Sequence, residues 1–379
     1  MGAMEKLAAH LGKRPLELRK LKSEGVKIIG YIPNGYMPEE LVYASGAIPV
    51  GLIRGGEHEP VAVSGSYLPR FLDTFCRSQI GYRMLGEDFL YQTVDLVVVP
   101  VTDNNIRAIA DSWSFYTDVK VFQYGVPHIK DGLGFQYYLV SLNELKERLA
   151  DFTGTKIDDD KTKEFMDLFN RMNGLLKEIS LLRKSERPPI SGRDFASLNH
   201  ASFYADPATF VDILQSLLQE LKEKETPVRK PRILLTGSTL AMGDYKILDM
   251  VEELGAAIVI EEFSEGIRPY WEKVEADGDP LKALAEAYFM RRTTPAFFRP
   301  SRERIDFVLK LAEDFKVDGL IWYQLMYRDS YDVESFYFEK ILKEKLGIPM
   351  LKVQSDYDKA ELGPLRTRIE TFIETLKGR

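Results

Sequence analysis

The stretch Val-Asp-Leu-Val-Val-Val-Pro-Val at residues 94–101 decides the fold class. Six of its eight residues are Val or Leu, and apolar side chains do not alternate with polar ones. A strand that is apolar on both faces is typical of the interior of a parallel sheet, where helices cover both sides. Polar residues 102–105 follow directly, so we expect a loop at the carboxyl edge of that sheet.

The same kind of pattern recurs on both sides of this stretch. Residues 26–31 and 47–52 predict strands, and residues 38–46 between them predict a helix with Pro38 at its first position and Gly46 past its end. Further strands are predicted at 120–124 and, after residue 230, at 233–238, 256–260, 317–323 and 348–353. Strands that alternate with helices in this way indicate parallel α/β units.

Between the two α/β patterns, residues from about 135 to 225 carry apolar side chains at helical spacing. We therefore predict an α/β fold with two Rossmann-like or flavodoxin-like domains, parallel sheets and a cleft between them. The predicted divisions are an N-terminal helical segment, a first α/β domain, a helical connector or insertion and a second α/β domain, at residues 1–25, 26–134, 135–229 and 230–379.

Composition excludes several classes of function. The 379 residues carry a net charge of −7 without a concentrated basic stretch, so nucleic acid and anionic membrane are poor partners. No apolar run is long enough to span a bilayer and no secretory signal is present, which favours a cytoplasmic protein. A single cysteine, Cys76, excludes a disulfide framework, a multi-cysteine zinc site and an all-cysteine iron–sulfur cluster within this chain.

Two acidic residues occupy positions that suit either a functional site or a helix N-cap. Asp73 precedes a predicted helix, and Asp103 follows the apolar strand. The simpler interpretation of each is a helix N-cap, because the first backbone N–H groups of a helix need an acceptor. Cys76 is most simply a small buried hydrophobic residue, since a reactive thiol needs electropositive surroundings.

Several blocks, taken in order, carry a resemblance over nearly the whole chain. One is Tyr67-Leu68-Pro69-Arg70, which is followed by Arg77-Ser78 and Gly81-Tyr82. The others are at residues 30–40, 44–50, 235–237, 317–319 and 366–372. Together they resemble the 2-hydroxyacyl-CoA dehydratase and benzoyl-CoA reductase family, and the chain is similar to its smaller subunit.

The resemblance implies a known set of cofactors and partners. In that family each subunit typically holds a [4Fe-4S] cluster between its two α/β domains, ligated by cysteines. An ATP-dependent activator delivers one electron, and the cluster-bearing heterodimer dehydrates a 2-hydroxyacyl-CoA or reduces an aromatic acyl-CoA. The implied partners are therefore a cluster-bearing paralogous subunit, the activator and an acyl-CoA. A homodimer remains an open alternative.

This sequence departs from the family where the cysteine ligands are expected. By the resemblance, the four ligand positions correspond to Asp73, Asp103, Ser264 and Arg328. Thiolates suit iron–sulfur clusters, and these side chains do not. We expect the fold to be retained without a cofactor in this chain, and Arg328 to form a buried ion-pair network with Asp73 and Asp103. A less favoured alternative is a hard cation such as Mg²⁺ held by Asp73, Asp103 and Ser264.

Three functions stay open at this point. The leading hypothesis is a dehydratase or reductase subunit that lacks its own cluster and acts with a cluster-bearing partner on an acyl-CoA. Its candidate substrate-binding residues are Asn34, Tyr36 and Glu40. The first alternative is a non-redox enzyme or small-molecule-binding protein that uses the cleft, with Asp73 or Asp103 as general base and Arg328 as an oxyanion partner. The second is a non-catalytic scaffold. Cys76 could still ligate a cluster together with a neighbouring chain.

Overall fold

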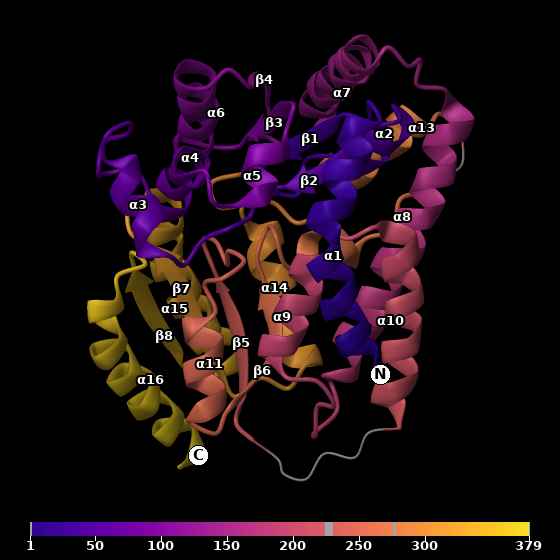
Figure 1. Cartoon of the computed structure of the whole chain (residues 1–379). Coiled ribbons are helices and arrows are strands. Elements are labelled where there is room, and N and C mark those ends of the chain that lie inside the picture. Colours follow the sequence, from indigo (N-terminus) through magenta and orange to yellow (C-terminus); the bar gives the residue numbers. More distant parts are fainter. Residues whose placement is uncertain (1, 224–229, 276–277, 379) are drawn as a thin grey trace.

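Two four-stranded parallel sheets form the framework of the chain (Figure 1). The computed structural model describes residues 2–223, 230–275 and 278–378. The first sheet has the order β2-β1-β3-β4, with β1 (Ile28–Tyr31), β2 (Ile48–Gly51), β3 (Leu96–Val101) and β4 (Lys120–Gly125). The second has the order β6-β5-β7-β8, with β5 (Arg232–Gly237), β6 (Ala257–Glu262), β7 (Gly319–Leu325) and β8 (Met350–Ser355). The predicted α/β class with parallel sheets is confirmed.

Helices surround both sheets. Those up to the end of the first half are α1 (Ala3–Ser23), α2 (Glu39–Ala44), α3 (His58–Ser64), α4 (Thr74–Leu85), α5 (Phe89–Thr93), α6 (Asn104–Tyr116) and α7 (Gly132–Thr153). The central ones are α8 (Asp159–Leu182), α9 (Gly192–Ala201) and α10 (Pro207–Lys222). The second half adds α11 (Lys246–Glu253), α12 (Ile267–Trp271), α13 (Pro280–Ala285), the π-helical turn η1 (Glu286–Arg291), α14 (Arg302–Asp314), α15 (Asp329–Leu346), the 3₁₀ turn η2 (Lys359–Glu361) and α16 (Leu362–Lys377).

Strand β3 lies between β1 and β4, and its residues are buried from Leu96 to Pro100. Its apolar character on both faces therefore matches its central position. Strand β7 holds the equivalent place in the second sheet and is buried throughout. Because these two strands are central, the loops that follow them meet at the middle of the molecule rather than at a sheet edge.

The helices of the central stretch divide between different neighbours. Helix α7 belongs to the first sheet, since Tyr138 and Leu142 share a hydrophobic core with Val98 and Phe122. Helices α8 and α10 pack on each other, α1 packs on α10, and α9 lies on β6. Residues 224–229, at the end of the predicted connector, lie outside the described residues.

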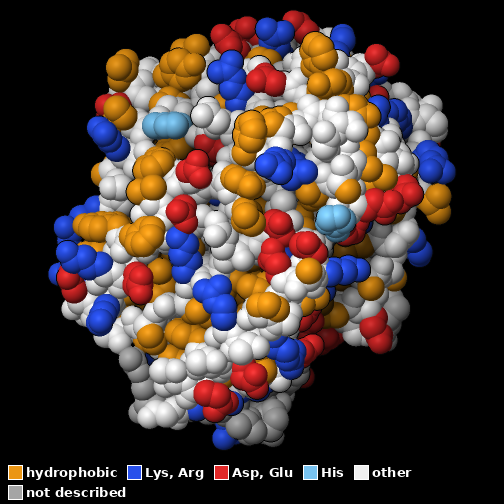
Figure 2. Space-filling model, turned by 90° about the vertical axis from the view of Figure 1, so that its left-hand side faces the viewer, with side chains coloured by type: hydrophobic (Ala, Val, Ile, Leu, Met, Phe, Trp, Pro, Cys, Tyr) orange, Lys and Arg blue, Asp and Glu red, His pale blue; other side chains and the backbone are white. Residues whose placement is uncertain are grey.

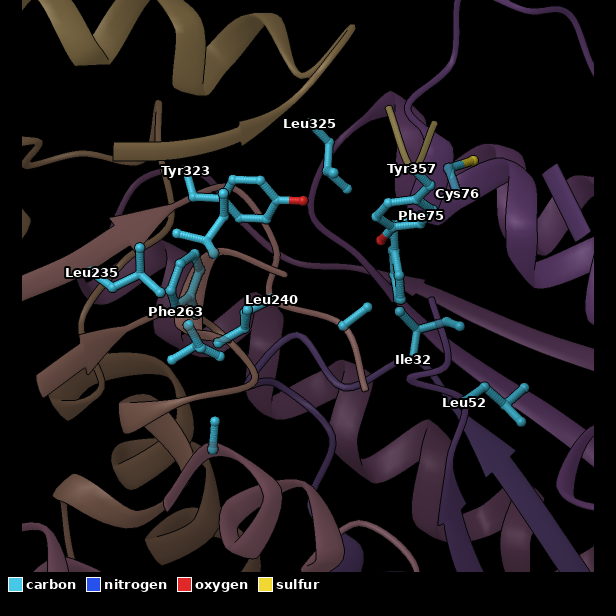
Figure 3. Close-up of a cluster of buried hydrophobic side chains, with 14 of the residues drawn as sticks. Ile32, Leu52, Phe75, Cys76, Leu235, Leu240, Phe263, Tyr323, Leu325 and Tyr357 are labelled. Carbon is cyan, nitrogen blue, oxygen red and sulfur yellow. The ribbon is translucent and has the colours of Figure 1, made fainter. Parts of the chain in front are cut away.

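Two features tie the halves together. The chain after β6 crosses back, so that Tyr288 and Phe289 of η1 enter the core of the first sheet. A second core is built from both sheets, and Figure 3 shows Phe75 on one side, Tyr323 on the other and Tyr357 reaching toward Phe75. Burying apolar surface between the halves favours one compact arrangement over two independent domains.

The surface and the helices bear on two functions that the composition disfavours, namely binding of nucleic acid and spanning of a membrane. On the face seen in Figure 2, acidic and basic side chains intermingle with small hydrophobic groups and no broad basic patch is visible. Among the described residues, no helix combines the length and the apolar character that a bilayer span requires.

Candidate functional site

Asp73 and Asp103 are both helix N-caps, which confirms the simpler interpretation of each. Asp73 precedes α4, and its Oδ1 accepts a hydrogen bond from the backbone N–H of Cys76 at 2.7 Å. Asp103 precedes α6, and its Oδ1 accepts from the N–H groups of Asn105 at 2.9 Å and Ile106 at 3.2 Å. The Thr102 hydroxyl donates to Oδ2 of Asp103 at 3.3 Å, and Oδ2 of each carboxylate also faces a second partner.

That second partner is Arg328, which reaches across from the end of β7 in the other half. Its Nη1 lies 3.0 Å from Oδ2 of Asp73, and its Nη2 lies 3.1 Å from Oδ2 of Asp103. The predicted ion-pair network is therefore confirmed. We call these three residues the ion triad. The side chains of Arg328 and Asp73 are 5% and 0% exposed, whereas that of Asp103 is 26% exposed.

The triad has a definite charge logic. Burial alone would lower the pKa of Arg328, but the carboxylates of Asp103 and Asp73 outweigh it and raise that pKa. Burial raises the pKa of Asp73, and Arg328 counteracts part of this rise. Arg328 also stands at the N-terminal boundary of α15, where the helix dipole disfavours a cation. The two carboxylates therefore stabilise a guanidinium that neither its burial nor its helix would accept alone.

Cys76 lies next to the triad without joining it. It is buried, and its thiol donates a hydrogen bond to the backbone carbonyl of Asn105 at 2.9 Å. Burial raises the pKa of the Cys76 thiol well above its usual range, and the nearby Asp73 carboxylate adds to the effect. Cys76 is therefore held as a neutral thiol and packs in the shared core, as the sequence predicts.

A small cavity lies between the two halves, at the carboxyl ends of both sheets. The residues that line it are Ile32, Pro33, Asn34, Ile53, Phe75, Thr102, Ile106, Ser238, Thr239, Ser264, Glu265, Pro295, Arg328 and Tyr331. The volume of the cavity is about 20 Å³, and a cavity needs roughly 10–15 Å³ to hold one water molecule. We call it the interdomain cavity; it has room for about one water molecule.

The other predicted site residues are placed differently with respect to this cavity. Ser264 lines it, and its Oγ accepts from Nη1 of Arg268 at 2.5 Å rather than from Arg328. Asn34 also lines it and donates to the carbonyl of Pro100 at 2.5 Å. Tyr36 and Glu40 lie outside its lining. The Tyr36 ring stacks on the Phe298 ring, with 6.0 Å between the ring centres. Oε2 of Glu40 accepts a hydrogen bond from the Tyr288 hydroxyl at 2.8 Å.

Glu265 is a cavity residue that the sequence analysis missed. It is 4% exposed, and its carboxylate accepts a hydrogen bond from the backbone N–H of Leu240. Burial raises the pKa of Glu265 to about 7, against opposing effects of that hydrogen bond and of the Arg268 and Arg328 cations. Its position directly after Ser264, in a loop that follows a strand, was the signal that could have identified it.

The side chains at the four positions that the resemblance assigns to cluster ligands do not fit an iron–sulfur cubane. Two carboxylates and a hydroxyl are hard oxygen donors, and the fourth position holds a guanidinium that cannot bind a metal. Cys76 is a neutral thiol whose Sγ is engaged with Asn105. In the described parts of the chain, no group of three or more His, Cys, Asp or Glu side chains is arranged to hold a metal ion.

Comparison with known proteins gives these positions a family context. The sequence profile described as 2-hydroxyglutaryl-CoA dehydratase, D-component, matches residues 34–376. The chain belongs to this family. The D-component match begins in the loop after β1 and ends within α16, so it includes both sheets and the ion triad.

Three relatives of the chain are subunits of dehydratases or of a reductase. The chain is 23% identical to the (R)-phenyllactyl-CoA dehydratase beta subunit of Clostridium sporogenes, covering 95% of this chain and 94% of the relative. It is 24% identical to a subunit of the benzoyl-CoA reductase of Thauera aromatica, covering 93% and 91%. It is also 24% identical to the beta subunit of (R)-2-hydroxyglutaryl-CoA dehydratase of Acidaminococcus fermentans, covering 95% of each chain. All three are subunits of enzymes that act on CoA thioesters, as their names state.

Proposed function

We propose that this chain is a D-component subunit that has lost its own iron–sulfur cluster and acts with a cluster-bearing partner subunit on an acyl-CoA. The observation that carries the proposal is the ion triad. Asp73, Asp103 and Arg328 stand at three of the positions that the resemblance assigns to cysteine ligands, and they satisfy one another by direct contacts of 3.0 and 3.1 Å. Side chains already paired in this way offer no free coordination to a metal.

In this proposal the chain's own residues do structural work at the centre of the subunit. The triad joins the loops before α4 and α6 to the loop after β7, so it links the two sheets. Asn105 strengthens the same link, because its side-chain amide donates to the carbonyl of Tyr327 at 3.2 Å. The interdomain cavity is then held at the size of one water molecule, which leaves the acyl chemistry to the partner subunit.

The direct test is a metal analysis under anaerobic conditions. Iron and acid-labile sulfide are measured in the purified chain alone, and again with any subunit that co-elutes with it. We expect the isolated chain to hold no stoichiometric iron and the partner to bring a cluster. Stoichiometric iron and sulfide in the isolated chain would overturn the proposal, and Cys76 would then have to be a ligand.

A gain-of-function variant tests the ligand positions themselves. Replacing Asp73, Asp103, Ser264 and Arg328 together by Cys supplies four thiolates, and anaerobic reconstitution with iron and sulfide is followed by absorbance and by metal content. We expect cluster uptake in this variant. The matched control carries the other three cysteines but retains Arg328, and we expect it to take up much less. Equal uptake by both variants would show that position 328 does not face the cluster site.

A second candidate function, a non-redox enzyme that uses the interdomain cavity, is supported by Glu265. A carboxyl group with a pKa of about 7 can both donate and accept a proton near neutral pH. In this version the base is Glu265 rather than Asp73 or Asp103, because Arg328 engages both of those carboxylates. Co-purification decides between the two: a cysteine-rich, cluster-bearing partner that co-elutes with the chain favours the cluster-free subunit. Activity of the isolated chain that is lost in Glu265→Gln favours the enzyme.

A further inference from the structure

A second buried guanidinium, that of Arg292, holds the loop after β1. Arg292 follows η1 and is 5% exposed. Its Nη1 donates to the carbonyl of Gly35 at 2.8 Å and its Nη2 to the carbonyl of Pro269 at 3.2 Å. Its Cζ lies 3.5 Å from the centre of the Tyr288 ring. Arg292 therefore fastens the loop that carries Asn34 to the other half of the chain.

Arg292 differs from the other buried arginines near the site in its charge balance. Arg304 and Arg328 each contact two carboxylates. Among the residues that the structure describes, none places a carboxylate oxygen within the 4.0 Å of an ion pair with Arg292. The backbone carbonyls and the Tyr288 ring solvate the cation in part. They supply no net negative charge, and a buried cation that lacks a close counter-ion is destabilising.

Two buried carboxyl groups, Glu39 and Glu40, interact with Arg292 electrostatically without forming an ion pair within 4.0 Å. Glu39 accepts a hydrogen bond from the Tyr31 hydroxyl at 2.5 Å, and Glu40 accepts one from the Tyr288 hydroxyl at 2.8 Å. Burial raises the pKa of Glu39 to about 8, so this carboxyl group carries its proton at neutral pH. Burial raises the pKa of Glu40 as well. Arg292 lowers both pKa values, but burial outweighs its effect, so these two residues neutralise Arg292 only in part.

A small cavity adjoins the guanidinium. Its lining includes Tyr31, Glu39, Ser202, Tyr288 and Arg292, and it leaves about 20 Å³ for the centre of a water-sized sphere. The Nε atom of Arg292 is buried and has no hydrogen-bond partner within the described structure. We call this space the Arg292 cavity. It combines a cation, an unused N–H donor and room for a single small particle.

We propose that the Arg292 cavity binds a monovalent anion of halide size, which serves as the counter-ion of Arg292. The space is small for phosphate or sulfate, and a single-atom anion satisfies both the charge and the free N–H. Because Arg292 also holds Gly35, an anion bound there steadies the loop that carries Asn34 into the interdomain cavity. This inference does not depend on the proposed function, since it concerns the isolated chain.

The test uses the full chain and chloride as the probe. Thermal unfolding is followed at constant ionic strength while sodium chloride replaces sodium gluconate. A ligand that binds only the folded state stabilises it in a saturable manner, so we expect Tm to rise by a few degrees and reach a plateau. Arg292→Met should abolish this response. The neighbouring Arg291→Met is the matched control, because Arg291 is more exposed and pairs with Glu275 at 3.4 Å, and it should retain the response.

Crystals soaked in bromide supply a second readout that needs no variant. We expect an anomalous peak beside Nε of Arg292. Hydrogen exchange at residues 33–37 should also slow when chloride replaces gluconate. A bromide-soaked crystal with only water in the cavity, or a Tm that is insensitive to chloride, would overturn the proposal. The proposal also fails if Arg291→Met and Arg292→Met respond alike. If Arg292→Met does not fold, the crystal and wild-type measurements still decide.

Discussion

Replacing Arg328 by Met removes the cation of the ion triad while keeping much of the side-chain volume. Asp73 is fully buried and loses its partner, whereas Asp103 is 26% exposed and can be solvated. Breaking a buried pair by removing one partner costs about 3–5 kcal/mol. Removing a cation from the start of α15 returns a few tenths of a kcal/mol, roughly. We therefore expect the free energy of unfolding at pH 7 to fall by about 3 kcal/mol, measured by urea denaturation.

The pH dependence and a double-mutant cycle sharpen this test. Without Arg328, the already raised pKa of Asp73 rises further, so the variant loses stability as pH increases and Asp73 is forced to ionise. The deficit relative to wild type should therefore be smaller at pH 5 than at pH 7. In the cycle with Asp73→Asn, the double variant should lose less than the two single losses together, with a coupling of roughly 0.5–3 kcal/mol.

A matched control separates the triad from a general effect of losing an arginine. Arg302 pairs with Asp306 at 3.5 Å on the surface of α14, where the two side chains are 76% and 58% exposed. Exposed pairs contribute about 0–1 kcal/mol, so Arg302→Met should change little. The reasoning is refuted if Arg328→Met unfolds within about 0.5 kcal/mol of wild type, or if its effect is additive with that of Asp73→Asn.

Three further predictions concern other parts of the core. The pKa of Glu265 rises from an ordinary 4.5 to about 7 on folding, so wild-type stability should decline from pH 5 to pH 7 by roughly 2 kcal/mol relative to Glu265→Gln; identical pH profiles would contradict this. Gly237→Ala should prevent stable folding, since its Cβ would lie 1.6 Å from the Tyr323 carbonyl oxygen. In the control Gly174→Ala, within α8, the new Cβ meets nothing within 4 Å. That variant should be neutral or stabilising when unfolding is followed by circular dichroism. Cys76 should react with a thiol reagent only after unfolding, because it is buried and protonated. Rapid labelling of the native protein would contradict the buried, protonated state described for Cys76.

The strands and helices of the fold can be predicted because the pattern of apolar residues within each short segment indicates how that segment is buried. The stretch at 94–101 predicts a strand buried on both faces, and β3 is central. The predicted strand at 317–323 is displaced from the observed β7, Gly319–Leu325. The reason is that Val317 and Asp318 complete the turn after α14: the Val317 N–H donates to Ala312, and Asp318 accepts from the Arg232 backbone at 2.8 Å.

The candidate site is less accessible to local reasoning. The N-cap roles of Asp73 and Asp103 could be predicted because capping involves residues only two or three positions apart. Their pairing with Arg328 spans more than 220 residues and was expected only through the family resemblance. Glu265 was missed because a Ser-Glu-Gly loop looks exposed in sequence. Its burial depends on distant contacts, with Leu240 on its carboxylate and Asn199 on its carbonyl.

The capping geometry suggests why aspartate suits positions where a relative would hold a thiolate. On our proposal Asp73 and Asp103 replace cysteine ligands, and each stands at a helix N-terminus. That environment stabilises a negative side chain of either kind, because free N–H groups and the helix dipole favour an anion. Aspartate is the better N-cap, so the helices tolerate the exchange. Without the cationic core of a cluster, the negative charges of Asp73 and Asp103 would be unbalanced, and the Arg328 guanidinium neutralises them at that point. The substitutions at positions 73, 103 and 328 are then one coupled change, which explains why no single reversion to cysteine should restore metal binding.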